Sequence, residues 1–144
     1  MRIKKVRVLC GGCFNQLHSG HVYFMKSAKS LGDYLVVIIS NDELNRKKYG
    51  KKAVPAVKRK RDVEKLKIAD MVVVGISPAD YKKVINKFKP DIIALGYDQN
   101  IELGATGFKV IRVPRQTSTM QSVAKRRQAI KLRHAILPLS RKKK

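Results

Sequence analysis

The stretch VRVLCGGCFNQLHSGH (residues 6–21) contains the transition that decides the fold of this chain. Residues 6–10 are apolar enough to form a buried strand, and a glycine-rich turn follows them. Residues 20–31 then have apolar side chains at three-residue steps, which predicts a helix that ends before Gly32. The chain therefore begins with a strand, a turn and a helix.

The same alternation continues along the chain. Further strands are predicted at 34–40, 71–75, 91–96 and 109–113, and further helices at 56–68, from Pro78 to before Pro90, and at 118–136. This order predicts an α/β fold: a single-domain, Rossmann-like, doubly wound sheet of about five parallel strands with helices on both faces. We expect the domain to occupy residues 1–136, followed by a basic tail at 137–144. Ligands of such sheets bind beyond the carboxyl ends of the strands.

The charge balance is strongly basic. The chain of 144 residues has 33 Lys and Arg against 10 Asp and Glu, a formal net charge of +23. Segments 46–67 and 115–144 carry most of this excess, which predicts an anionic partner without saying which one. No apolar run is long enough for a membrane span or an export signal, so we expect a cytoplasmic protein without a membrane partner. The two cysteines fit a reducing compartment.

Four side chains capable of metal or redox chemistry fall within twelve residues: Cys10, Cys13, His18 and His21. They could form a Cys2His2 zinc site, although the ligand spacing is shorter than structural zinc sites usually have. Cys10 and Cys13 alone could form a redox dithiol, although the helix begins well after Cys13. Two buried, inert thiols are the simpler interpretation of the cysteines.

A phosphate site explains more of these residues. Gly11 and Gly12 would let the backbone approach a ligand closely, and Ser19 could cap the helix that follows. A helix N-terminus favours an anion. His18 and His21, three positions apart at the helix start, could both donate hydrogen bonds to charge that develops on a phosphate. No side-chain nucleophile is needed if the attacking group is itself a phosphate.

Several stretches resemble one enzyme family. GCFNQLHSGH (12–21) is similar to the G-x-F-D-x-x-H-x-G-H signature of the cytidylyltransferase-like nucleotidyltransferases. AKSLGDYLVVIISNDELN (28–45) resembles the glycerol-3-phosphate cytidylyltransferases, KPDIIALGYDQ (89–99) resembles the archaeal FAD synthases, and VPRQTSTMQS (113–122) resembles a late element shared across the family. The resemblance implies transfer of AMP or CMP from ATP or CTP to a small phosphorylated acceptor, FMN or glycerol 3-phosphate, with release of pyrophosphate.

The resemblance also implies roles for individual residues. Catalysis falls to His18, His21, Lys48 and Arg115. Nucleotide binding falls to Gly12, Cys13, Phe14, Asn15, Gly20, Gly96, Asp98, Ser118 and Thr119, and acceptor binding to Lys51 and Arg59. A divalent ion, Mg²⁺ or Mn²⁺ or Co²⁺, would be held largely by the triphosphate with few protein ligands. The family further implies a homodimer.

Two features leave alternatives open. Asn15 stands where the family signature has aspartate, which removes one negative charge near the phosphates. Cys13 and the pair Ala56-Val57 also depart from the family pattern, as does the absence of cysteines near the carboxyl end, and together these differences put the FMN acceptor in question. The net charge and the cluster of basic residues at 125–133 would also suit a nucleic-acid-binding module, possibly with the Cys2His2 zinc site. Against that alternative, the chain has no tryptophan and no recognition-helix motif.

Overall fold

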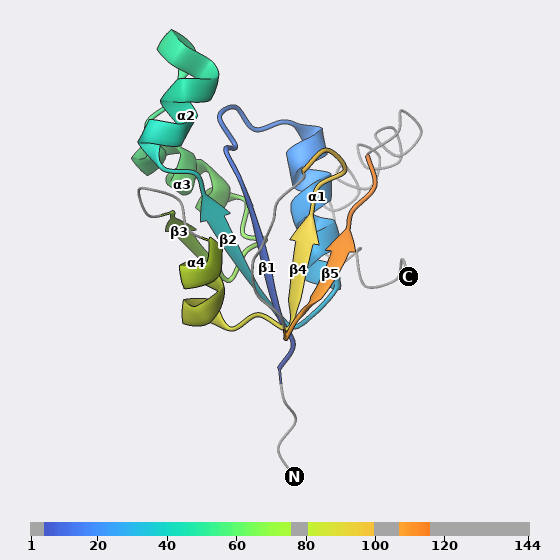
Figure 1. Cartoon of the computed structure of the whole chain (residues 1–144). Coiled ribbons are helices and arrows are strands. Elements are labelled where there is room, and N and C mark those ends of the chain that lie inside the picture. Colours follow the sequence, from blue (N-terminus) through green and yellow to red (C-terminus); the bar gives the residue numbers. More distant parts are fainter. Residues whose placement is uncertain (1–4, 76–80, 100–106, 116–144) are drawn as a thin grey trace.

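A computed structural model describes residues 5–75, 81–99 and 107–115. Its strands are β1 (Arg7–Gly12), β2 (Tyr34–Ile39), β3 (Met71–Val74), β4 (Ile92–Leu95) and β5 (Lys109–Arg112). Its helices are α1 (Ser19–Ser30), α2 (Asp42–Tyr49), α3 (Ala56–Lys65) and α4 (Tyr81–Phe88), with a 3₁₀ turn η1 (Gly50–Lys52). The five strands form one parallel sheet in the order β3-β2-β1-β4-β5, which confirms the predicted doubly wound fold (Figure 1).

The two faces of the sheet bury separate apolar layers. Alternate residues of β1 and β2 pack with Met25 and Ala28 of α1 and with Val63 of α3 on one face. The intervening residues pack with Ile85 of α4 on the other face. Strands that are covered on both sides must be apolar in every position, which explains the run YLVVII of β2.

The carboxyl end of β1 differs from the prediction. Gly11 and Gly12 belong to the strand, where they pair with Ile38 and Ile39 of β2, rather than to a turn. A Cβ at Gly11 would come within 3.1 Å of the carbonyl oxygen of Ile38, so a side chain there would crowd the neighbouring strand. The strand therefore extends two residues further toward the site than its apolar pattern indicates.

The segment after β2 was predicted only as a basic stretch, and it forms α2. The side chain of Asn41 caps this helix by accepting a hydrogen bond from the backbone of Leu44 (2.9 Å). Acidic residues lie in its first turn and basic residues in its last, as the helix dipole favours. The predicted helix at 118–136, the tail at 137–144 and the start of the helix at Pro78 lie outside the described residues.

The topology defines where a ligand binds. The chain runs from β1 through β2 to β3 and then returns to place β4 on the opposite side of β1. The strand order therefore reverses between β1 and β4, and the crevice at their carboxyl ends is the expected ligand site. None of the helices in the described ranges is long and apolar enough to cross a membrane.

Candidate active site

The two histidines form the N-terminal cap of α1. The N-cap residue is His18, not Ser19 as predicted, and its Nδ1 accepts a hydrogen bond from the Gly20 N–H (3.0 Å). The Nδ1 of His21 accepts a hydrogen bond from the His18 N–H (3.3 Å). Because a neutral imidazole accepts at one nitrogen and carries its hydrogen on the other, both rings have Nε2–H. The cap thus fixes the tautomer of both rings.

Packing fixes the orientation of both rings. The imidazoles of His18 and His21 are stacked with centroids 3.8 Å apart, and the ring of Phe14 meets His21 edge-on at 5.3 Å. Burial lowers the pKa of His21 to about 4, and the charges of His18 and Lys48 act in the same direction, against a hydrogen bond with the Gln16 backbone. His21 is therefore a neutral hydrogen-bond donor at physiological pH.

Gly20 is required by the ring of His18. A Cβ at this position would lie 2.8 Å from Cε1 of His18, closer than Cβ atoms approach other atoms, and 3.0 Å from its Nδ1. Any other residue would push the imidazole off the helix N-terminus. The glycine between the two histidines thus serves the geometry of the pair.

The loop after β4 is tied across the point where the strand order reverses. The Gln99 side chain accepts from the Gly96 N–H (2.8 Å) and donates to the carbonyl of Gly11 (3.0 Å). Arg112 at the end of β5 donates to the carbonyls of Gly96 (2.8 Å) and Gln99 (2.7 Å). These bonds hold Asp98 at the mouth of the crevice.

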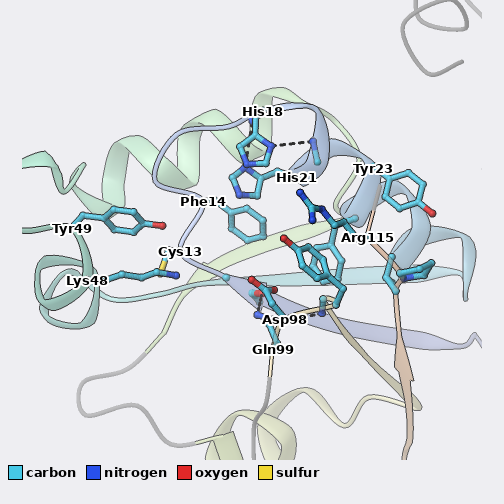
Figure 2. A pocket seen from close by; sticks show the side chains of 18 residues that line it. Cys13, Phe14, His18, His21, Tyr23, Lys48, Tyr49, Asp98, Gln99 and Arg115 are labelled. Carbon is cyan, nitrogen blue, oxygen red and sulfur yellow. Dashed lines mark hydrogen bonds between the residues drawn. The ribbon is translucent and has the colours of Figure 1, made fainter. Parts of the chain in front are cut away.

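A pocket of about 450 Å³ occupies this crevice. Its walls come from the end of β1, the start of α1, the last turn of α2 and the loops after β4 and β5. The predicted site residues that line it are Gly12, Cys13, Phe14, His18, Gly20, His21, Lys48, Gly96, Asp98 and Arg115. Lys48 and Arg115 approach the histidines from opposite sides (Figure 2).

A second pocket of about 530 Å³ adjoins the first. It shares His18, His21 and Tyr49 with the first pocket and adds Asn15 and Lys52 among its lining residues. The stacked histidines therefore contact both compartments. Such an arrangement leaves room for two substrates that meet at the imidazoles.

The remaining predicted residues are placed differently. Arg59 is 0% exposed, and its guanidinium donates to the carbonyls of Val54 (2.7 Å) and Cys13 (2.9 Å) and to the side chains of Ser40 and Asp42 (3.2 Å each). Every branch of the guanidinium has a protein partner, so the expected contact with the acceptor is replaced by an internal network. Lys51 is exposed on η1 and lines neither pocket. Ser118 and Thr119 lie outside the described residues.

The cysteines do not form a site with the histidines. Cys10 is buried in β1, and burial raises the pKa of its thiol to about 12, so it is an inert apolar side chain. Both cysteines are free, and the described ranges contain no group of three or more His, Cys, Asp or Glu side chains able to hold a metal ion. The structure therefore does not favour a Cys2His2 zinc arrangement of these four residues.

Sequence reasoning missed several residues of the site. Tyr97, with Arg115 stacked 5.6 Å from its ring centroid, lines the main pocket, as do Tyr49 and Gln99. Tyr97 and Gln99 flank the predicted Asp98, so their position just after the end of a strand could have indicated that they line the site. Tyr49 follows Lys48 on a helix that was not predicted, so nothing distinguished it.

Comparison with known proteins agrees with this geometry. The model of the Cytidylyltransferase-like family matches residues 9–136. The FAD synthase of Thermococcus sibiricus is 39% identical over 121 residues, which cover 77% of this chain and 82% of that protein. The FAD synthase of Thermococcus onnurineus is 44% identical over 123 residues, with 77% and 81% covered.

Solved structures give the same result. The lipopolysaccharide core biosynthesis protein of Thermoplasma volcanium superposes with a TM-score of 0.71 at 32% identity, covering 79% of this chain and 100% of that one. Pantothenate synthetase from Thermus thermophilus, with a TM-score of 0.54 at 12% identity, shares the fold alone.

The chain belongs to the cytidylyltransferase-like family. It is a nucleotidyltransferase, an enzyme that transfers a nucleotidyl group to a phosphorylated acceptor with release of pyrophosphate, and the nucleic-acid-binding alternative is not favoured.

Proposed function

We propose that this enzyme transfers AMP from ATP to FMN, forming FAD and pyrophosphate. The observation that carries the proposal is the similarity to FAD synthases, which extends over about four-fifths of their length. The paired pockets on either side of His18 and His21 support it, because one compartment suits a triphosphate and the other a phosphorylated acceptor.

In this reaction an oxygen of the FMN phosphate attacks the α-phosphorus of ATP. The new P–O bond forms as the bond from the α-phosphorus to the bridging oxygen breaks, and pyrophosphate leaves with the electron pair. The Nε2–H groups of His18 and His21 donate to the α-phosphate and bridging oxygens as negative charge builds on them. No proton transfer from a side chain is required, because both phosphates are already ionised.

The cationic residues hold the polyphosphate on both sides of the histidines. Lys48, in the last turn of α2, approaches the α-phosphate, while Arg115 after β5 binds the β- and γ-phosphates. Gly12, Cys13 and Phe14 form the floor, and Gly96 with Asp98 faces the nucleoside. Ser118 and Thr119 follow Arg115 in the sequence and would extend the polyphosphate site.

The second pocket is the proposed acceptor compartment. Its Lys52 supplies positive charge for the FMN phosphate, and Tyr49 offers an aromatic face to the flavin ring. Lys51 lies on the same 3₁₀ turn and would add a screened attraction from outside the pocket. This assignment replaces the direct acceptor role expected for Arg59.

A divalent ion fits this site only as a companion of the triphosphate. Among the described residues that line the main pocket, Asp98 alone has a carboxylate, so the pocket offers too few oxygen ligands for a dedicated metal site. Mg²⁺, or Mn²⁺ or Co²⁺ in its place, would neutralise charge on the phosphate oxygens when bound with the nucleotide. We further propose that residues 1–136 act as one catalytic domain, in a cytoplasmic homodimer.

A matrix of two nucleotides and two acceptors tests the proposal. Purified protein with Mg²⁺ is mixed with ATP or CTP and with FMN or glycerol 3-phosphate, and pyrophosphate release is followed. Release that requires ATP and FMN together supports the proposal. Release with CTP and glycerol 3-phosphate would keep the enzyme class and reject the proposed substrates.

A further inference from the structure

Two amide side chains, Asn15 and Asn45, lie beside the main pocket without lining it, and Asn15 also lines the second pocket. Asn45 of α2 is 0% exposed, and its Nδ2 donates to Asn15 Oδ1 (2.9 Å) and to the carbonyl of Val54 (3.3 Å). Asn15 Oδ1 also accepts from the Val54 N–H (2.8 Å), and its Nδ2 donates to the carbonyl of Lys52 (3.0 Å). The pair thus joins the loop after β1, helix α2 and the segment 52–54.

The hydrogen bonds determine which atom each amide must present. Both partners of Asn45 Nδ2 are acceptors, so the amide cannot be rotated to bring Oδ1 there. Position 15 must supply an acceptor on one branch and a donor on the other. Aspartate, the residue in the family signature, would place a carboxylate oxygen against the carbonyl of Lys52. Asparagine at position 15 is therefore matched to its surroundings in this chain.

The arrangement costs stability. Asn45 Oδ1 is buried and has no hydrogen-bond partner among the described residues, and a buried acceptor without a partner is unfavourable. Leucine has nearly the same shape as asparagine and would remove this oxygen. The two acceptors that Asn45 serves would keep other donors, since Arg59 binds the Val54 carbonyl and the Val54 N–H binds Asn15. We therefore expect the Asn45→Leu variant to fold.

Asn45 lies one turn before the residues of α2 that reach the site. Lys48 and Tyr49 lie three and four residues after Asn45, on the same side of the helix, and both line the main pocket (Figure 2). We propose that Asn45, together with Asn15, is a positioning residue that fixes α2 at the site so that Lys48 meets the phosphates. The role of Lys48 in this inference rests on the proposed function.

Asn45→Leu tests the inference, with Arg46→Gln, on the exposed side of the same helix, as the matched control. In the unliganded full chain, amide hydrogen exchange in residues 42–54 should be faster in Asn45→Leu, while the melting temperature is unchanged or higher. The kcat for pyrophosphate release should fall about tenfold or more, with KM for ATP changed less than about threefold. The reason is that the charge of Lys48 is kept and its placement is lost. Arg46→Gln should alter none of these values.

Two results would overturn the proposal. One is unchanged exchange and kcat in Asn45→Leu. The other is a fall in melting temperature that alone accounts for the lost activity. If Asn45→Leu does not fold, Asn15→Asp decides through the exchange measurement, because it keeps the acceptor and loses the donor to Lys52. Unchanged amide exchange in residues 42–54 would then reject the role. If the wild type makes no FAD, the proposed function fails, whereas the exchange comparison still decides the positioning role.

Discussion

The histidine cap makes the stability of the enzyme depend on pH in a defined window. The pKa of His21 falls from 6.5 to about 4 on folding, chiefly because the ring is buried. Below pH 6.5 the unfolded chain therefore binds a proton at His21 that the folded chain does not. The contribution of neutral His21 to the free energy of unfolding is fully present above this pH and is lost as the pH falls toward 4.

The size of this loss follows from the shift. At about 1.36 kcal/mol per unit, the change from 6.5 to about 4 sets an upper limit of about 3 kcal/mol. His21 is only half-buried, so solvent screening reduces the expected loss to about 1–2 kcal/mol. Among the described groups, the pKa of Asp70 is also lowered from 3.8, because its burial is outweighed by hydrogen bonds from Lys29 and the Leu35 N–H, and this carboxyl therefore titrates outside the window.

Urea unfolding at about pH 7 and about pH 4.5 measures the effect. His21→Gln is the informative variant, because glutamine at the third helical position preserves the capping box and does not titrate. The wild type should lose about 1–2 kcal/mol more free energy of unfolding than His21→Gln between the two pH values. Equal losses in the wild type and His21→Gln would refute the neutral state of His21 and with it the donor role.

Three further predictions concern cationic residues. Lys48→Ala should lower kcat/KM for pyrophosphate release about tenfold or more, since a charge-assisted hydrogen bond contributes roughly 1.5–3 kcal/mol. Lys47 is an exposed neighbour that does not line the main pocket, so Lys47→Ala should change kcat/KM less than about twofold. Equal losses of kcat/KM in Lys48→Ala and Lys47→Ala would indicate that the lysines act through general positive charge and not through a direct contact. Arg115→Lys should recover only part of the kcat/KM lost in Arg115→Ala, because lysine lacks the planar fork; full recovery would argue against a bidentate contact. Arg59→Ala should lower the free energy of unfolding by about 2–4 kcal/mol in urea titrations, and an unchanged value would contradict the buried network.

The fold could be predicted because burial on both faces of a parallel sheet leaves a clear apolar signal. Each of the five strands appears in the sequence within one or two residues of its place in the structure. Helix α2 was missed because Leu44 is its only strongly apolar residue, so hydrophobic periodicity gives no signal. Its polar cap and its charge order were present in the sequence and would have indicated it.

Site residues could be predicted where their type and spacing indicate their role. They could not be predicted where their role depends on how separate segments pack together. His18 and His21 were found from their spacing at a helix start, and the structure brings them to the pocket. The complete burial of Arg59 could not be foreseen, because arginine is almost never fully buried without partners and those partners come from three separate segments. The same holds for Asn45, whose environment depends on how α2 meets the loop after β1.

Transfer of the α-phosphate is the central chemical claim, and an isotopic label follows it directly. Purified full-length protein is incubated with Mg²⁺, FMN and ATP that is labelled on the α-phosphate, and the products are separated. The mechanism predicts that the label appears in FAD and not in pyrophosphate, and that His18→Ala and His21→Ala each lower the rate by roughly 10²–10³ while the proteins remain folded. Label that stays in ATP whichever phosphorylated acceptor is supplied, or rates that survive both substitutions, would contradict it.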